Sequence, residues 1–316
     1  MAKSKSRKGK KKTLTTSVFI NPKTDFGFKK IFGNKERLIA FLSAVLCKTI
    51  VLIEFVPQEQ FGDKAKDRKV IYDLYCTSDT GERFIVEMQN DGHKYFADRA
   101  LFYATYPIRS QAPKGKLTVI DENGKKVSKH WDYHLNKVYF IAILNFILFK
   151  EEESKDIVIE EISLTRHFSG LGFTDALKFI TIELPKFNKS EDELVTPMDK
   201  WLYSLKNMEK LNQRPEQCNE EVFQQLYEEA KVDNLNSKEM KAYNKSILEY
   251  EDVVLTMDYA VEQAEQRGEQ RGEQRGVQRE RARHILKLFQ NGFSAVQIAE
   301  LTDLPVKEVN NIIKNS

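Results

Sequence analysis

The sequence has few cysteines and no long apolar segment. Its three cysteines, Cys47, Cys76 and Cys218, lie far apart, and their spacing fits neither a disulfide framework nor a zinc site. The longest apolar run, Val138–Phe149, is too short to cross a bilayer and reads as a buried strand or core helix. No apolar stretch follows the basic N-terminus as it would in a signal peptide. We therefore expect a cytoplasmic protein without a membrane segment.

Neither sign of charge dominates, so overall charge does not mark a nucleic-acid-binding protein. The net charge is +3, but the first 12 residues carry seven lysines and arginines and no acidic residue, which leaves −4 for the remainder. Such a tail suits loose contacts with phosphates. The same composition is typical of a disordered solubilising arm. Binding of a nucleic acid must therefore depend on local sites.

Changes in composition along the chain predict five segments. Short apolar strands alternate with amphipathic helices in the largest of them, which indicates an α/β domain. The next is polar and helical, with an apolar stripe at Trp201, Leu202, Leu205 and Met208. The segments are residues 1–16 (basic disordered tail), 17–190 (α/β core), 191–260 (helical extension), 261–284 (repeat helix or linker) and 285–316 (helix-turn-helix-like unit).

A four-residue repeat, Glu-Gln-Arg-Gly, begins at Glu265 and occurs three times. Its period places Gly268, Gly272 and Gly276 on one slowly drifting stripe of a helix. Each interior glycine costs about 1 kcal/mol relative to alanine. We therefore expect a helix that is marginal by itself and serves as a linker or a close helix–helix contact.

The C-terminal residues have a helix-turn-helix pattern. Gly292 follows a helix stop, Ser294 is suited to cap a short helix, and Pro305 introduces the last helix. In a DNA-binding unit the exposed residues of the last helix would contact DNA. These residues are Lys307, Asn310 and Asn311. The same apolar spacing also serves packing or oligomerisation modules, so both interpretations stay open.

Two β-rich runs flank the turn at residues 79–81 and predict a β-hairpin. A three-residue loop places Asp73 opposite Glu87, with Gln89 on the same face as Glu87. A register slip of one residue would instead put the two carboxylates on opposite faces. In the first register the other face is a core face, formed by Val70, Tyr72, Leu74, Cys76, Phe84, Val86 and Met88.

Two carboxylates that meet across a hairpin repel each other, and something must offset that repulsion. A divalent cation is the simplest candidate, because carboxylate oxygens suit Mg²⁺ or Mn²⁺. Asp73 and Glu87 would then be metal ligands. Gln89 would position or polarise a water beside the metal.

Cationic and aromatic residues flank these two strands. Arg68 and Lys69 precede the first strand, and helical spacing places Tyr95, Arg99 and Tyr103 on one face. We interpret them as a phosphate clamp in which aromatic rings support the arginine. The alternative is an ordinary surface face with a snorkelling arginine.

Together these stretches resemble the Rpn family of recombination-promoting nucleases, also described as transposases, in the PD-(D/E)XK nuclease superfamily. The repeat and the small C-terminal helical unit also recur in that family. The matching stretches are Asn21–Gly33, Asp73 with Glu87-Met88-Gln89, Tyr95–Tyr103, Val138–Leu144 and Ile182–Phe187.

The resemblance implies an α/β, restriction-endonuclease-like mixed sheet flanked by helices and followed by a helical C-terminal region. It implies Mg²⁺-dependent endonuclease cleavage of DNA, with Asp73 and Glu87 as metal ligands and Gln89 in the catalytic set. Asp25 would hold metal through water, although Asp25 and Thr24 also suit helix N-caps. Lys29, in the matching motif, would contact DNA.

Gln89 stands where the superfamily usually has lysine, so slower chemistry is expected. A catalytically degenerate DNA-binding or assembly protein is the alternative. We expect DNA as the partner, Mg²⁺ or Mn²⁺ as the cofactor, and no small-molecule cofactor. A homodimer is also expected, because a twofold dimer matches the symmetry of duplex DNA and brings two active sites to its two strands.

Overall fold

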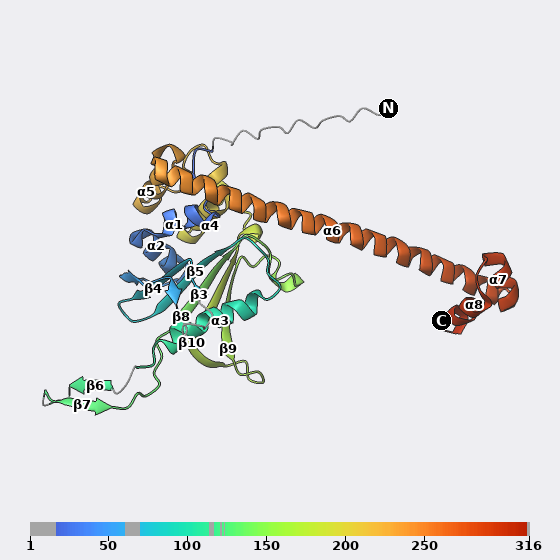
Figure 1. Cartoon of the computed structure of the whole chain (residues 1–316), viewed down its shortest axis with the longest axis horizontal. Helices are drawn as coiled ribbons and strands as arrows, with labels where there is room; N and C mark the ends of the chain where they lie inside the picture. Colours follow the sequence, from blue (N-terminus) through green and yellow to red (C-terminus); the bar gives the residue numbers. More distant parts are fainter. Residues whose placement is uncertain (1–16, 61–69, 114–116, 121, 123, 315–316) are drawn as a thin grey trace. The chain divides into compact units, whose positions relative to one another are not determined.

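The computed structural model describes residues 17–60, 70–113, 117–120, 122 and 124–314 (Figure 1). The fold consists of two units that divide after Val254. The predicted DNA contacts Arg68 and Lys69, together with the basic tail at residues 1–16, lie outside the described residues.

A six-stranded mixed sheet forms the centre of the first unit. Its order is β1-β4-β5-β8-β10-β9, with β5, β8 and β10 parallel and the other neighbours antiparallel. β8 is buried along its whole length, so the strand interpretation of the apolar run is confirmed. The strands are β1 (Ile53–Phe55), β4 (Leu74–Ser78), β5 (Arg83–Gln89), β8 (Val138–Leu144), β9 (Ile159–Thr165) and β10 (Gly172–Glu183). Two further pairs join β2 (Glu59–Gln60) to β3 (Val70–Ile71), and β6 (Leu117–Ile120) to β7 (Lys126–Lys129).

Helices pack on both faces of this sheet, which confirms the predicted fold class (Figure 1). One face packs against α1, α2, α4 and α5 in a core that contains Phe41 and Trp201. The other packs against α3 through residues such as Ile85 and Ala100. The helices are α1 (Asp25–Phe32), α2 (Lys35–Leu46), α3 (Phe96–Arg109), α4 (Pro197–Asn207) and α5 (Glu221–Glu229). Short 3-10 turns occur at Glu152–Ser154, Leu184–Lys186, Glu191–Glu193, Met208–Lys210 and Val232–Asn234.

The β4–β5 hairpin has the predicted register. Leu74 pairs with Val86, and Thr77 pairs with Arg83. Gly81 closes the loop with a φ of 81°, a conformation that glycine adopts without steric cost. Continued by one residue, this register places the backbone of Asp73 across from that of Glu87.

The predicted core face is wrong at Val70 and Tyr72, which belong to the core on the α3 side. Alternation fails there because Asp73 forms a bend between β3 and β4, and β3 pairs with β2. Tyr72 and Tyr75 therefore lie on one side, with ring centroids 5.3 Å apart. The other predicted members line the opposite core, namely Leu74, Cys76, Phe84, Val86 and Met88.

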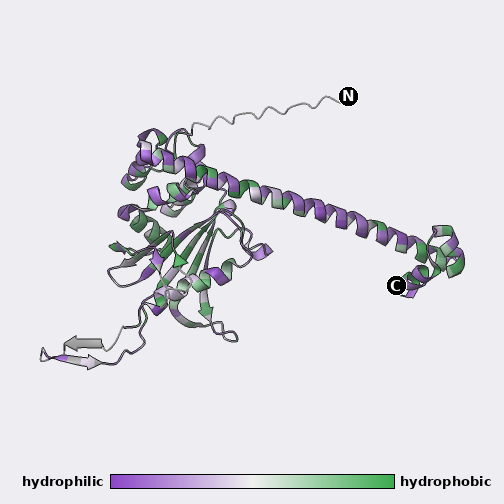
Figure 2. Cartoon of the chain, viewed as in Figure 1, coloured by the Kyte–Doolittle hydropathy of each residue, from purple (hydrophilic) through white to green (hydrophobic). Residues whose placement is uncertain are grey.

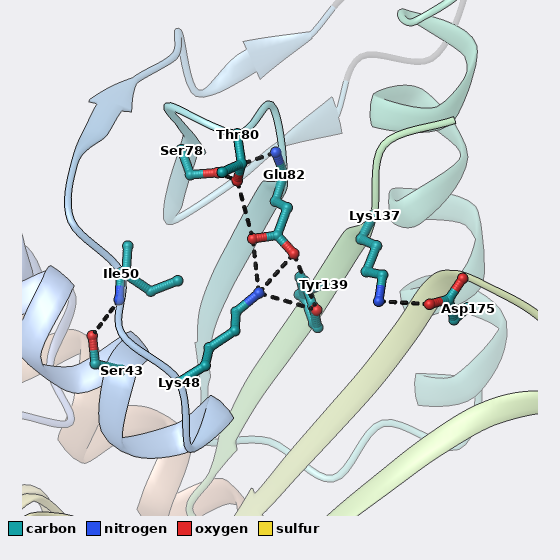
Figure 3. A network of polar contacts seen from close by, with 9 residues as sticks. All are labelled: Ser43, Lys48, Ile50, Ser78, Thr80, Glu82, Lys137, Tyr139 and Asp175. Carbon is teal, nitrogen blue, oxygen red and sulfur yellow. Dashed lines mark hydrogen bonds and ion pairs between the residues drawn. The ribbon is translucent and has the colours of Figure 1, made fainter. Parts of the chain in front are cut away.

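An ion pair fastens the turn of this hairpin to its surroundings (Figure 3). Lys48, which follows α2, donates to the two carboxylate oxygens of Glu82 at 2.6 and 2.7 Å. Its ammonium also lies 3.4 Å from the hydroxyl of Tyr139 on β8. Because the contact joins α2, the turn and β8, it fixes the end of the hairpin opposite to Asp73.

The segment that enters α1 needs a glycine at position 27. A Cβ there would lie 2.0 Å from the carbonyl oxygen of Asn21. Thr24 is the N-cap of α1, since its hydroxyl accepts a hydrogen bond from the Gly27 N–H at 3.0 Å. Asp25 is the first helical residue, so the interpretation of Asp25 as the cap is wrong.

α6 (Ser237–Gln290) is one continuous helix that includes the glycine repeat. Its first turns contact the segment around α1, because the Asn21 N–H donates to the Tyr243 hydroxyl and the Phe26 N–H to Ser246, both at 3.0 Å. Glutamate, glutamine and arginine favour helix and offset the glycines. The helix is largely hydrophilic (Figure 2). In the described ranges we find no helix with the length and apolarity that a bilayer crossing requires.

The second unit has its own small core. α7 (Ala295–Thr302) and α8 (Val306–Lys314) pack with the end of α6 through Ile285, Ile298 and Val309. Ser294 caps α7 in a capping box with Gln297, as its sequence predicts. Gly292, with a φ of 89°, follows the end of α6.

Replacement of Gly27 by alanine is expected to destabilise the first unit by about 3 kcal/mol, because the new methyl group overlaps backbone. The measurement is chemical denaturation followed by circular dichroism. Gly172→Ala is the control, since a Cβ at Gly172 meets nothing within 4 Å. Equal stability of the two variants would contradict the close approach at Asn21.

Candidate functional site

Two carboxylates meet where β4 and β5 begin to separate. Glu87, on β5, is buried with 1% of its surface exposed. Its Oε1 accepts a hydrogen bond from the backbone N–H of Asp73 at 3.1 Å. In return, Asp73 Oδ2 accepts from the backbone N–H of Met88 at 2.9 Å. Each of the two carboxylates thus accepts a hydrogen bond from the backbone on which the other lies, or from the residue next to it.

Burial dominates the electrostatics of this pair. Loss of solvent and, as a smaller cause, the nearby Asp73 carboxylate together raise the pKa of Glu87 to about 8. Burial also raises the pKa of Asp73, against the lowering effect of the Met88 N–H. Two such groups do not easily hold two negative charges together. The site therefore favours either a shared proton or a bound cation.

Gln89 and Arg99 complete one side of the pair. The Gln89 amide nitrogen donates to Glu87 Oε2 at 3.1 Å, and its amide oxygen accepts from the Arg99 guanidinium at 3.3 Å. A second guanidinium nitrogen lies 3.9 Å from Glu87 Oε2. The guanidinium carbon stands 5.0 Å from the centre of the Tyr103 ring. Arg99 and Tyr103, one helical turn apart on α3, are thus neighbours, as their helical spacing predicts.

α1 brings a second group of charges to Asp73. Asp25 and Lys29 form an exposed ion pair with a nitrogen–oxygen distance of 2.7 Å. The Asp25 carboxylate raises the pKa of Asp73, whereas the Lys29 ammonium lowers it. Both charges therefore act on Asp73 from the α1 side.

The structure brings together most of the predicted site residues and leaves others elsewhere. Lys307, Asn310 and Asn311 are exposed on α8 in the second unit. Tyr95 precedes α3 and is exposed. The residues around the carboxylate pair are Asp25, Lys29, Asp73, Glu87, Gln89, Arg99 and Tyr103.

Sequence patterns missed three residues that hold the site in place. The Gln58 side-chain amide donates to the Asp73 carbonyl at 2.6 Å. The Asn145 N–H donates to the Gln89 carbonyl at 2.9 Å, and its side-chain amide donates to the Tyr250 hydroxyl of α6 at 3.3 Å. Asn145 carries a signal, since it is a polar residue that interrupts an apolar run at a strand end. Gln58 and Tyr250 carry none.

The donor set fits a hard divalent cation. Asp73 and Glu87 offer carboxylate oxygens, which Mg²⁺ and Mn²⁺ prefer. A cation between them would also offset the loss of solvent that raises both pKa values and the repulsion by Asp73 that adds to the pKa of Glu87. Within the described ranges no group of three or more histidine, cysteine, aspartate or glutamate side chains is placed to hold a metal. Water or substrate would have to complete the coordination.

The geometry agrees with a comparison to known families. A model of the PD-(D/E)XK nuclease family transposases matches residues 22–260, which is more than half of the chain. The chain belongs to this family. Comparisons with curated proteins and with solved structures give no match. The PD-(D/E)XK assignment confirms the superfamily that the sequence motifs indicated, and the matched range contains every residue around the carboxylate pair.

The metal-free protein is expected to lose stability as the pH rises from about 4.5 to about 8. Glu87 keeps its proton in the fold up to a pKa of about 8, whereas the unfolded chain loses it near 4.5. The folded state thus binds more protons in this window, and the free energy of unfolding falls with pH. Calorimetric melting in EDTA across the window measures the slope, which Glu87→Gln should flatten.

Stabilisation by Mg²⁺ or Mn²⁺ should show the opposite trend, because the ligands must lose protons to bind metal. At a hundred times Kd the added stability is about 2.7 kcal/mol. Its size should grow between pH 6 and pH 8.5, the two sides of the Glu87 pKa of about 8. An equal metal-induced shift in Glu87→Gln would show that the cation binds elsewhere.

Proposed function

We propose that this PD-(D/E)XK protein is a metal-dependent DNA endonuclease that acts in recombination or transposon-related DNA processing. The observation that carries the proposal is the Asp73–Glu87 pair. Glu87 accepts a hydrogen bond from the backbone N–H of Asp73, and Asp73 accepts one from the backbone N–H of Met88. The family match at residues 22–260 supports it. We also propose that the protein acts in the cytoplasm, where its free cysteines stay reduced.

Asp73 and Glu87 would hold Mg²⁺ or Mn²⁺, with Asp25 reaching it through water from α1. Bound there, the cation would supply Lewis acidity and an activated water for phosphodiester hydrolysis. The protein itself supplies a fixed geometry, because both carboxylates are tied to the hairpin backbone. The amide oxygen of Gln89 faces Arg99, and its amide nitrogen faces Glu87.

DNA would approach along the exposed cations next to the pair. Lys29 on α1 and Arg99 on α3 are both about half exposed, at 44% and 41% of the side chain. Their charges suit contacts with phosphate oxygens of the DNA backbone at the site. Arg68, Lys69 and the basic tail would add to this non-specific attraction.

The second unit would provide further DNA contacts through Lys307, Asn310 and Asn311 on α8. Their exposure and the packing of α7 against α8 suit a helix-turn-helix arrangement. A homodimer would present two active sites to the two strands. The alternative role of this unit is oligomerisation alone.

A second candidate, a catalytically degenerate DNA-binding or assembly protein, is favoured by Gln89 in the usual lysine position. A glutamine offers only dipoles to the scissile phosphate, whereas lysine offers a full charge. The two candidates differ in whether a metal binds at Asp73 and Glu87 and whether DNA is cut.

Nicking of supercoiled plasmid with Mg²⁺ tests the proposal. Asp73→Asn and Glu87→Gln should each lower the rate by about 10²-fold or more, because the charged ligands are lost. EDTA should abolish cleavage. Asp79→Asn, an exposed acid in the turn of the same hairpin, should cut like the wild type.

If the wild-type protein fails to cut the plasmid, or cuts it equally well in EDTA, the proposal of a metal-dependent endonuclease is refuted. If calorimetry then detected no Mg²⁺ or Mn²⁺ binding while DNA still shifted on a gel, the degenerate binding protein would be the better description.

A further inference from the structure

In the part of the chain that the structure describes, the Arg99 guanidinium is the cation next to Glu87 and Gln89. Its side chain is 41% exposed, so part of it is accessible to a substrate. The other edge donates to the Gln89 amide oxygen at 3.3 Å and lies 3.9 Å from Glu87. A guanidinium has five N–H donors in a planar fork. One hydrogen bond to Gln89 leaves donors that suit phosphate oxygens.

Two aromatic rings support the position of Arg99, one by direct contact and the other by packing against the first. Its guanidinium lies 5.0 Å from the Tyr103 ring centre, a distance typical of cation–π contacts. Tyr103 in turn meets Tyr72 edge-on at 5.7 Å, and the Tyr72 hydroxyl donates to the Tyr103 carbonyl at 2.9 Å. The arginine is therefore oriented before any substrate binds.

The Gln89 amide is matched to this arginine. Its oxygen faces the guanidinium and its nitrogen faces the Glu87 carboxylate. The reversed amide would place donor against donor and acceptor against acceptor. A lysine at position 89 would bring an ammonium next to the guanidinium, and these like charges would repel. A neutral residue at position 89 and a cation at position 99 are thus complementary.

The other nearby cation is less available. Lys29 reaches the site from α1, but its ammonium is already paired with Asp25 at 2.7 Å. Among the described residues, the ion pair of Arg99 is the longer one, a 3.9 Å contact with Glu87.

We propose that Arg99 is a catalytic residue that binds the scissile phosphate in place of the missing lysine, with Gln89 as its positioning residue. This inference rests on the proposed function. In the hydrolysis, a bond forms between the water oxygen and phosphorus, and the bond from phosphorus to the leaving sugar oxygen breaks. The water loses a proton to solvent, and the leaving oxygen takes one up. Arg99 donates to the non-bridging oxygens, where negative charge accumulates.

Plasmid cleavage by Arg99→Ala in the full chain tests this role. The rate should fall about 10²-fold, and millimolar guanidinium chloride should restore part of it. The same salt should leave Asp73→Asn inactive. Arg109→Ala, an exposed arginine at the end of the same helix, should retain the wild-type rate. Loss of activity without rescue by guanidinium, in a variant with wild-type circular dichroism, would overturn the role.

A double-mutant cycle tests the match between positions 89 and 99. Gln89→Lys alone should slow cleavage because its ammonium displaces Arg99. In the Arg99→Gln background the same lysine should instead raise the rate at least about tenfold. Additive effects of the two substitutions would overturn the positioning role of Gln89.

Metal binding provides a readout that does not depend on cleavage. Without DNA, Arg99→Ala should bind Mn²⁺ more tightly in calorimetry, because a positive charge next to Glu87 has been removed. Unchanged or weaker Mn²⁺ affinity would contradict the contact between Arg99 and the pair.

The outcomes separate this inference from the proposed function. A wild-type protein that never cuts DNA refutes both. A wild type that cuts, with Asp73→Asn inactive and Arg99→Ala unimpaired, refutes only the role of Arg99.

Discussion

The burial of two like charges against each other is the constraint around which the first unit is arranged. Glu87 is inside the fold and Asp73 lies across the hairpin from it. Burial disfavours the ionised form of both groups, and repulsion by Asp73 adds to this at Glu87. Backbone N–H groups, the Gln89 amide and the Arg99 guanidinium each compensate part of this cost. Two buried carboxylates with raised pKa values and several hydrogen-bond donors around them are typical of a functional site, and their burial lowers the stability of the fold.

The hairpin that carries this pair was predictable because its determinants are local. A short turn with glycine at position 81 sets the register, and alternation then places Glu87 and Gln89 on one face. The apolar stripe beginning at Trp201 and the cap at Ser294 were equally local, and both are confirmed. The positions of Asp73 and Glu87 in the hairpin could therefore be predicted from sequence.

The rest of the site depends on contacts that the sequence does not encode locally. The bend at Asp73 places Tyr72 in the core on the α3 side. The bend follows from the pairing of β3 with β2, which is not part of the hairpin. Gln58 and Tyr250 approach the site from elements far apart in the chain. Likewise, spacing suggested that Arg99 and Tyr103 share a face, but only packing of α3 on the sheet brings that face to Gln89.

Because β5 and β8 are parallel, the carboxylate site lies near the C-terminal ends of both strands, and the chain enters both at the opposite end. Arg83 pairs with Val138 at one end, whereas Glu87 pairs with Ala142 and Gln89 with Leu144 toward the other. The connection from α3 through β6 and β7 enters β8 at Val138, away from the carboxylates. Insertions, deletions or a fused reporter in that connection can therefore be accommodated during divergence or engineering without displacing the acidic pair.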